Sequence, residues 1–305
     1  MQIYSNHILS LLILVLTAAV GISCQNTNSD NAQKQTENTG ENPARIITLS
    51  GFLTELVYAL DAGDQVVGVD ATSTYPAEVN QMNKLGHITQ LNAEGILSLN
   101  PDIVFVQEDQ LRQSEALTQL QNSSIKIIPV PVSYTLDNAI QAAQTIAQYV
   151  DINPQALENL KTQVNTDKSK LKEFLKDKTD KPSVLFIYAR GGGNLMVAGN
   201  KTNAQAIIEL AGGKNAVTEF DQFRALTPES LVQASPDVIL MFDSGLKALN
   251  GRDGLAAIPG ISQTNAYKNN RIVAMDGHYL TSFGPRTGQA ALELARHFFT
   301  PGESM

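Results

Sequence analysis

Catalytic and metal-binding patterns are the first features we sought in this sequence. The four histidines and the acidic residues show none of the short spacings that transition-metal sites require, so a bare metal site is not expected. The segment from Gly193 to Lys201 differs from a phosphate-binding loop, because five residues separate its glycines and Asn200 precedes the lysine. No Gly-x-Ser-x-Gly turn is present. We therefore do not expect an enzyme. A membrane-tethered α/β enzyme with an unrecognised acid–base pair is the alternative from another class.

The single cysteine occupies a position that suggests attachment to a membrane. Residues 8–22 form an apolar run of 15 residues, which is shorter than a transmembrane helix and typical of a secretory signal peptide. Small residues precede Cys24 and a polar stretch follows it, which resembles the lipobox of bacterial lipoproteins. By that resemblance, residues 1–24 are a signal peptide ending at an acylated Cys24, and residues 25–42 form a flexible linker. An uncleaved signal anchor is the alternative, since residues 1–7 contain no Lys or Arg.

The composition excludes several classes of protein. The 305 residues contain 22 Lys and Arg against 30 Asp and Glu, a formal net charge of -8, which is not typical of nucleic-acid binding proteins. Hydrophobic residues make up 43% of the chain, which excludes bulk disorder. One cysteine excludes a disulfide framework. We expect a monomer of two medium-sized domains with no nucleic-acid partner.

Short β-rich runs alternate with helix-length segments, which predicts an α/β fold with mostly parallel sheets. The predicted strands are 45–49, 65–69, 102–106, 126–130, 183–188, 237–242 and 271–275. The predicted helices are 53–60, 93–99, 114–121, 137–150, 203–210, 228–234 and 287–299. Asn153 and Pro154 are typical of a helix start, and apolar residues at helical spacing continue to about residue 178. We therefore expect two lobes, 43–150 and 182–305, joined by one long, stiff connecting helix within 151–181.

An internal repeat relates the two predicted lobes. Residues 93–109 align without gaps on residues 228–244, at an offset of 135 residues, and both copies contain a Pro-Asp pair followed by coinciding apolar positions. The repeat predicts lobes of related topology with a ligand cleft between them. Glu94 and Glu229 occupy equivalent places on the first turn of a predicted helix, where acidic side chains are locally favourable.

Two similar lobes around a cleft are the arrangement of solute-binding proteins, and several motifs resemble one family of them. Residues 45–55 (RIITLSGFLTE) and 66–70 (VVGVD) resemble the start of class III, or cluster A, binding proteins of ABC transporters, which include vitamin B12, ferric-siderophore and haem binders. Residues 70–76 (DATSTYP), 93–99, 203–213 and 276–287 (DGHYLTSFGPRT) resemble the periplasmic haem (hemin) binding proteins in particular. The resemblance covers residues 45–296.

The resemblance implies roles for individual side chains. Tyr75 matches an axial ligand of haem iron, and a phenolate is a hard anionic donor that suits Fe(III). Some haem binders place a histidine near the position of Arg190, which we expect to pair with a haem propionate instead. His278 and Tyr279 follow a predicted strand, so either could supply a sixth ligand. The porphyrin faces are expected to contact apolar side chains such as Phe52 and Met196.

The same resemblance implies the partners of the chain. Glu94 and Glu229 match glutamates that dock onto arginines of the two permease subunits of the transporter. We therefore expect an extracytoplasmic lipoprotein that binds haem and delivers it to an ABC importer for haem and iron uptake. A corrinoid or ferric-siderophore ligand is the alternative within the family, although a siderophore pocket usually contains several Arg together with Trp or Tyr residues, and this chain has no Trp. A lipoprotein that scavenges haem without a transporter is a third interpretation.

Overall fold

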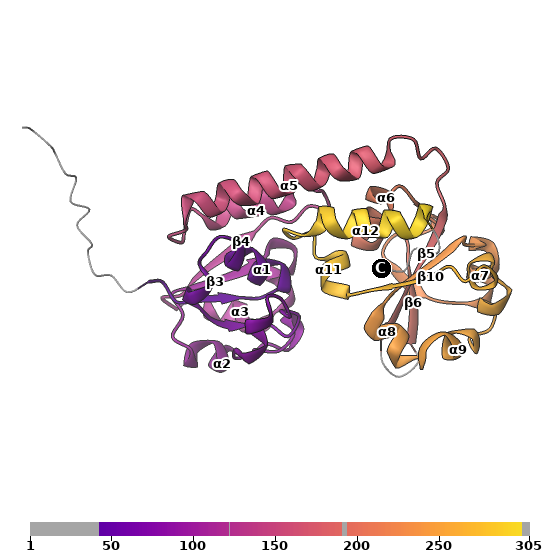
Figure 1. Ribbon diagram of the computed structural model, residues 1–305. Helices are drawn as coiled ribbons and strands as arrows, with labels where there is room; N and C mark the ends of the chain where they lie inside the picture. Colours follow the sequence, from indigo (N-terminus) through magenta and orange to yellow (C-terminus); the bar gives the residue numbers. More distant parts are fainter. Residues whose placement is uncertain (1–42, 122, 191–193, 301–305) are drawn as a thin grey trace, which may run out of the picture. The chain divides into compact units, whose positions relative to one another are not determined.

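The computed structural model describes residues 43–121, 123–190 and 194–300 (Figure 1). The signal peptide, Cys24 and the linker predicted over residues 1–42 lie outside the described residues, and so do the side chains of Arg190, Asn194 and Val232. Within the described ranges, no helix is both long enough and apolar enough to span a membrane. The described chain forms two α/β lobes connected by a long helix, as the sequence predicts.

The N-terminal lobe is built on a parallel sheet with the strand order β2-β1-β3-β4. Its strands are β1 (Ile46–Thr48), β2 (Val66–Val69), β3 (Ile103–Gln107) and β4 (Lys126–Val130). Its helices are α1 (Gly51–Ala59), α2 (Ala93–Ser98), α3 (Glu115–Leu120) and α4 (Asn138–Ile146). The sheet is covered on both faces, since Ile103 and Phe105 of β3 pack with α1 and α4 while Val104 and Val106 pack with α2 and α3.

The C-terminal lobe contains a mixed sheet with the order β10-β9-β5-β6-β8, and β7 pairs with β5. Its strands are β5 (Ser183–Arg190), β6 (Asn194–Ala198), β7 (Lys214–Asn215), β8 (Phe223–Ala225), β9 (Val238–Phe242) and β10 (Ile272–Met275). Its helices are α6 (Asn203–Leu210), α7 (Pro228–Ala234), α8 (Asp243–Ala248), α9 (Gly251–Ala256), α10 (Asn265–Lys268), α11 (Gly277–Thr281) and α12 (Thr287–Phe299). The strands β6 and β8 run antiparallel to their neighbours and were not predicted.

The connecting helix α5 (Pro154–Leu175) begins where the sequence predicts. The Asn153 side chain accepts a hydrogen bond from the Gln155 backbone, and Pro154 occupies the first turn. The helix ends at Leu175, slightly before the predicted end, and its 22 residues span about 33 Å. It packs against α1 and α4 of the N-terminal lobe and against α12 of the C-terminal lobe (Figure 1).

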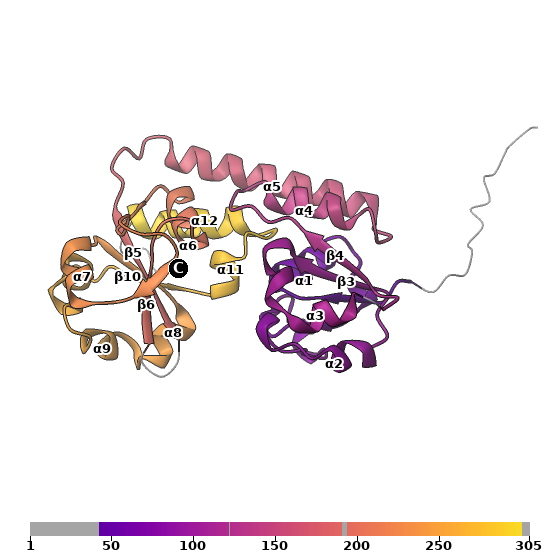
Figure 2. The ribbon, with the colours of Figure 1, turned by 180° about the vertical axis from the view of Figure 1, so that it is seen from behind.

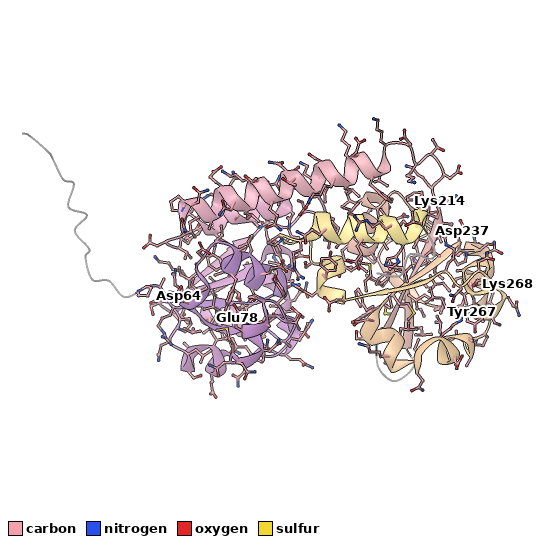
Figure 3. All side chains as sticks on the ribbon, viewed as in Figure 1. Asp64, Glu78, Lys214, Asp237, Tyr267 and Lys268 are labelled. Carbon is pink, nitrogen blue, oxygen red and sulfur yellow. The ribbon has the colours of Figure 1, made fainter. Side chains whose placement is uncertain are left out.

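The internal repeat corresponds to a repeated helix–strand unit. In the N-terminal lobe the unit is α2 followed by β3, and in the C-terminal lobe it is α7 followed by β9. The turn between helix and strand contains a residue of positive φ at matching positions, Asn100 (44°) and Ser235 (36°). Asp237, labelled in Figure 3, lies immediately before β9, as Asp102 lies before β3. The two units therefore share their backbone conformation as well as their sequence.

Candidate functional site

Tyr75 lies in the loop that follows β2, at the carboxyl end of the N-terminal sheet. Ligands of α/β proteins usually bind at this end of the strands. Tyr75 is 43% exposed, and it lines a small depression together with Thr74, Asp276, Tyr279 and Arg286. The depression combines residues of both lobes, because Asp276 to Arg286 follow strand β10 of the C-terminal lobe.

A buried chain of hydroxyl groups determines the path of the loop that leads to Tyr75. The Asp70 carboxylate accepts hydrogen bonds from the hydroxyls of Thr72 (2.6 Å) and Ser73 (2.7 Å). The Ser73 hydroxyl also bonds the Thr54 hydroxyl at 2.6 Å, and Thr54 bonds Thr48 at the same distance. Asp70, Ser73, Thr54 and Thr48 are all at most 2% exposed. Buried polar groups whose hydrogen bonds are satisfied specify one conformation, so the loop is held in place by α1 and β1.

Arg286 packs directly on the face of Tyr75. The guanidinium carbon lies 3.6 Å from the centre of the Tyr75 ring and 5.1 Å from the centre of the Tyr279 ring. The same guanidinium donates two hydrogen bonds to Glu55, from Nε to Oε1 (2.7 Å) and from Nη2 to Oε2 (2.9 Å). Arg286, a residue of the C-terminal lobe, therefore contacts both α1 and the loop that carries Tyr75 in the N-terminal lobe.

Glu55 is the central acceptor of this junction between the lobes. It belongs to α1, is 3% exposed, and also bonds His278 Nε2 through Oε2 at 2.8 Å. Burial alone would raise the pKa of Glu55, but hydrogen bonds from His278 and Arg286 and the charges of both lower it. The helix α11, which carries His278, lies on the side of the C-terminal lobe nearest the N-terminal lobe in both views (Figures 1 and 2). Glu55 and Arg286 were not predicted as site residues, although Glu55 lies within the motif 45–55 and Arg286 within the motif 276–287.

A cavity of about 550 Å³ lies between the lobes, within the usual volume range of small-molecule sites. Its lining residues come from both lobes: Ser50, Gly51, Phe52, Thr72, Thr74, Gln107, Asp109, Gln110, Val132, Tyr134, Asn203, Phe242, Asp243, Ser244, Asp276, Gly277, His278, Thr281 and Ser282. Thr74 and Asp276 line both this cavity and the depression around Tyr75, so the two are adjacent. Among the described lining residues, none is Lys or Arg, while three are Asp.

The structure brings some of the predicted ligand-binding residues together and separates others. Phe52 lines the interlobe cavity, although it is 2% exposed and most of its surface packs in the core. Met196 lines a different cavity, with Leu195, Leu226, Pro228 and their neighbours, which shares no lining residue with the first. That Met196 contacts a porphyrin face stays a prediction. The unpredicted antiparallel pairing of β6 with β8 places Met196 opposite Ala225.

His278 and Tyr279 both reach the site, but neither resembles an uncommitted iron ligand. Nε2 of His278 is occupied by Glu55, and its Nδ1 lies against Gly51, where an added Cβ would come within 2.5 Å. Burial raises the pKa of Tyr279 far above its usual value, and the adjacent Glu293 raises it further, while Arg286 opposes the shift. The raised pKa disfavours the phenolate form of Tyr279. The Tyr279 ring is the second aromatic ring near the Arg286 guanidinium, after that of Tyr75.

Glu94 and Glu229 occupy the first turns of α2 and α7, as predicted, and both are exposed. Asn92 and Thr227 cap these two helices through their side chains. The backbone hydrogen bond at the helix start, followed by the hydrogen bond from Thr227, lowers the pKa of Glu229. The two glutamates thus present carboxylates to solvent from equivalent positions in the two lobes, outside the interlobe cavity.

The described residues offer little for binding a bare metal ion. In the part of the chain that the structure describes, no three His, Cys, Asp or Glu side chains gather in a way that could hold one. Haem iron has different requirements, because the porphyrin supplies four nitrogen ligands and the protein supplies axial ones.

Comparison with known proteins defines the class of this chain. A family model described as periplasmic binding protein matches residues 46–279, and the chain therefore belongs to this family of solute-binding proteins, which are not enzymes. The solved structure of the periplasmic heme-binding protein RhuT from Roseiflexus sp. RS-1, in its apo form, is 38% identical. The match covers 85% of this chain and 98% of that chain, with a TM-score of 0.79. The periplasmic heme-binding protein BhuT, solved in complex with two hemes, is 31% identical over 84% of this chain and 98% of that chain, with a TM-score of 0.77.

Curated relatives agree on the class and differ in the ligand. The ABC transporter substrate-binding lipoprotein YvrC of Bacillus subtilis is 29% identical over 275 residues, which is 88% of this chain and 84% of that protein. A cobalamin-binding protein of Halobacterium salinarum is 24% identical over 84% of this chain and 69% of that protein. The present chain is accordingly a substrate-binding protein of an ABC transporter and works outside the cytoplasm.

Proposed function

We propose that this chain binds haem in the interlobe cavity, with the Tyr75 phenolate as axial ligand of ferric iron, and delivers it to an ABC importer. The observation that carries the proposal is the position of Tyr75 beside the interlobe cavity, on a loop held by the Asp70 and Ser73 hydrogen bonds. Tyr75 is 43% exposed, so its hydroxyl oxygen can face a ligand. The solved heme-binding proteins that resemble this chain support the choice of ligand.

Residues around the cavity suggest how haem would be oriented. The described lining includes Asp109, Asp243 and Asp276 but no Lys or Arg, so haem propionates buried against it would be repelled. We propose that Arg190, at the end of β5, binds a propionate, since a guanidinium forms paired hydrogen bonds with a carboxylate. Apolar lining such as Phe52 would contact the porphyrin face, and burial of that face would supply most of the affinity.

An absorption titration of the chain lacking residues 1–24 tests the proposal. Ferric haem is expected to bind saturably and to show a phenolate-to-iron charge-transfer band, which Tyr75→Phe removes because the phenyl ring cannot ligate iron. Tyr149→Phe is the matched control, since Tyr149 is 42% exposed and lies outside the cavity. Saturable binding whose band survives in Tyr75→Phe would refute Tyr75 as the ligand.

A corrinoid is the second candidate ligand, because curated relatives include cobalamin-binding proteins and the cavity lining is rich in carboxylates and amides. Corrin side chains end in amides, which can donate to carboxylates where propionates would be repelled. A parallel titration with cobalamin separates the candidates. Tighter binding of cobalamin than of haem would replace the haem proposal.

We further propose that Cys24 carries the lipid that holds the protein at the membrane. The apolar run before Cys24 and the lipoprotein description of YvrC support this. Replacement Cys24→Ser removes the thiol that is acylated, so the full chain is expected to lose incorporation of a radiolabelled fatty acid. Equal labelling of the wild type and the variant would exclude Cys24 as the lipidation site.

A further inference from the structure

Arg286 links a buried carboxylate to the side chain that we propose as the iron ligand. One side of its guanidinium group bonds Glu55 through two nitrogens, at 2.7 and 2.9 Å, and its central carbon lies 3.6 Å from the centre of the Tyr75 ring. Glu55 itself is 3% exposed and belongs to α1; it does not line the cavity, although it bonds His278, which does. The two N-terminal-lobe residues are therefore connected through one C-terminal-lobe side chain.

The paired hydrogen bonds determine where the guanidinium can lie. A planar guanidinium that donates from two nitrogens to one carboxylate is fixed in both position and plane, unlike a lysine ammonium. A cation fixed above an aromatic ring is attracted to the ring face, and the attraction grows when the ring oxygen carries a negative charge. Because Arg286 covers one face of Tyr75, the ring cannot turn freely, and its hydroxyl edge keeps one direction.

The contacts with Glu55 also favour the positively charged form of Arg286. Burial alone would lower the pKa of Arg286, but the hydrogen bonds and the charge of Glu55 raise it, with smaller contributions from Tyr75 and Tyr279. Tyr279 lies 5.1 Å from the guanidinium carbon and limits its movement on that side. The guanidinium is thus a fixed positive charge beside the phenol ring.

We propose that Glu55 and Arg286 form a positioning pair for Tyr75: Glu55 holds Arg286 against the ring, and Arg286 orients the phenolate and stabilises its bond to ferric iron. The inference rests on the proposed function, since it assigns a role within the haem site. Glu55 acts on Tyr75 through Arg286, and its hydrogen bond to His278, which lines the cavity, is a separate contact. One consequence is that the ligand tyrosine of one lobe is oriented correctly only when the other lobe is in place.

The experiment compares the purified chain lacking residues 1–24 with the variants Arg286→Met, Arg286→Lys and Glu55→Gln. Each protein is titrated with ferric haem, and the dissociation constant and the position of the charge-transfer band are recorded. Loss of the cation–π contact in Arg286→Met is expected to weaken haem binding roughly 3- to 30-fold and to shift the band. Arg286→Lys keeps the charge but not the paired hydrogen bonds, so it should restore part of the affinity. Glu55→Gln should resemble Arg286→Met, and the double variant should be no worse than either single one.

Asn138→Ala is the control for a general loosening of the lobes. Asn138 is 1% exposed and donates to the Phe283 carbonyl at 3.0 Å, so its loss removes another buried contact near Arg286 without touching Glu55 or Tyr75. It should lower the thermal midpoint and leave the band position unchanged. The positioning role would be overturned if Glu55→Gln left both the charge-transfer band and the haem affinity unchanged. It would also be overturned if Asn138→Ala shifted the band as much as Glu55→Gln does. A wild-type chain without a charge-transfer band would instead refute the proposed function, so the two failures are distinguishable.

Discussion

Asp102 and Asp237 perform the same structural task in the two lobes. The Asp102 carboxylate accepts a hydrogen bond of 2.8 Å from the backbone nitrogen of Arg45, and the Asp237 carboxylate accepts one of 2.8 Å from the backbone nitrogen of Ser183. Arg45 directly precedes β1 and Ser183 begins β5, the strands beside which β3 and β9 pair. In each copy of the repeat, the aspartate of the Pro-Asp pair therefore connects two parallel neighbouring strands through a hydrogen bond from backbone to side chain.

Replacing either aspartate should destabilise the fold. We expect Asp102→Ala and Asp237→Ala each to lower the free energy of unfolding by about 1–3 kcal/mol, since each leaves a backbone N–H without its charged acceptor. Asp102→Asn and Asp237→Asn should cost less, because the amide oxygen can still accept. Urea denaturation of the four variants measures this. Alanine variants as stable as the wild type would show that water replaces the carboxylate without cost.

Gly51→Ala should disturb the contact between the lobes. An added Cβ at Gly51 would lie 2.5 Å from His278 Nδ1 and 2.8 Å from the Thr72 carbonyl, so α11 and the loop before Tyr75 must both move. We expect a loss of about 1–3 kcal/mol in the free energy of unfolding. Gly95→Ala is the control, because its added Cβ would make only ordinary contacts and Gly95 lies inside α2, where alanine favours the helix. Equal stability of the Gly51 and Gly95 variants would contradict the close approach of His278.

Acid should weaken the Glu55 junction. The pKa of Glu55 is lower in the folded chain than its usual 4.5, so its contribution to stability is fully present above pH 4.5 and declines as pH falls through the folded value. Glu55→Gln should cost about 2–4 kcal/mol at pH 7, because it leaves Arg286 and His278 without a charged partner. Urea denaturation of both proteins from pH 7 to pH 3 should show the difference shrinking below pH 4.5. If the difference in the free energy of unfolding between the two proteins stayed constant over this range, the pKa of Glu55 would not be lowered by folding.

Charge reversal at Glu94 and Glu229 should impair delivery but not binding. We propose that these exposed carboxylates dock on the two permease subunits, one for each lobe. Glu94→Lys with Glu229→Lys should reduce uptake by at least about tenfold through repulsion of permease arginines. The haem dissociation constant should change less than about twofold, because both residues lie outside the cavity lining. Uptake in cells and titration of the purified variant measure the two effects, and normal uptake would exclude the docking role.

Tyr279→Phe should retain the charge-transfer band of the haem complex. The raised pKa of Tyr279 disfavours its phenolate, so Tyr279 is not expected to ligate iron. The ring that flanks Arg286 is preserved by phenylalanine. Absorption spectra of the ferric haem complexes of Tyr279→Phe and Tyr75→Phe provide the comparison. Loss of the band in Tyr279→Phe alone would reverse the assignment of the two tyrosines.

Local sequence signals predicted much of the architecture. The start of α5 follows from the capping ability of Asn153 and the fixed backbone of Pro154, and α12 was predicted at its observed bounds, Thr287–Phe299. The repeat predicted two related lobes, because matching helix–strand units need matching neighbours. The pairing of β6 with β5 was missed, because the glycine-rich sequence between the two strands interrupts any alternating pattern.

The candidate site was predictable only in part. Tyr75 was identified through its family motif, but Glu55 resembles, in sequence, an ordinary residue of an amphipathic helix. Its partners His278 and Arg286 lie 223 and 231 residues away along the chain. No local pattern reports a contact at that separation, because it depends on how the two lobes pack. The surroundings of Met196 were not predictable for the same reason, since they depend on the unpredicted pairing of β6 with β8.

The continuous helix α5 has a consequence for the kinetics of transport. Since it packs along both lobes, widening the gap between them requires bending a helix of 22 residues and separating α12 from it. We therefore expect loading to need only small movements of the lobes, so that its rate follows the frequency of encounters between cargo and cavity. We expect unloading to be the step for which the importer must separate the lobes.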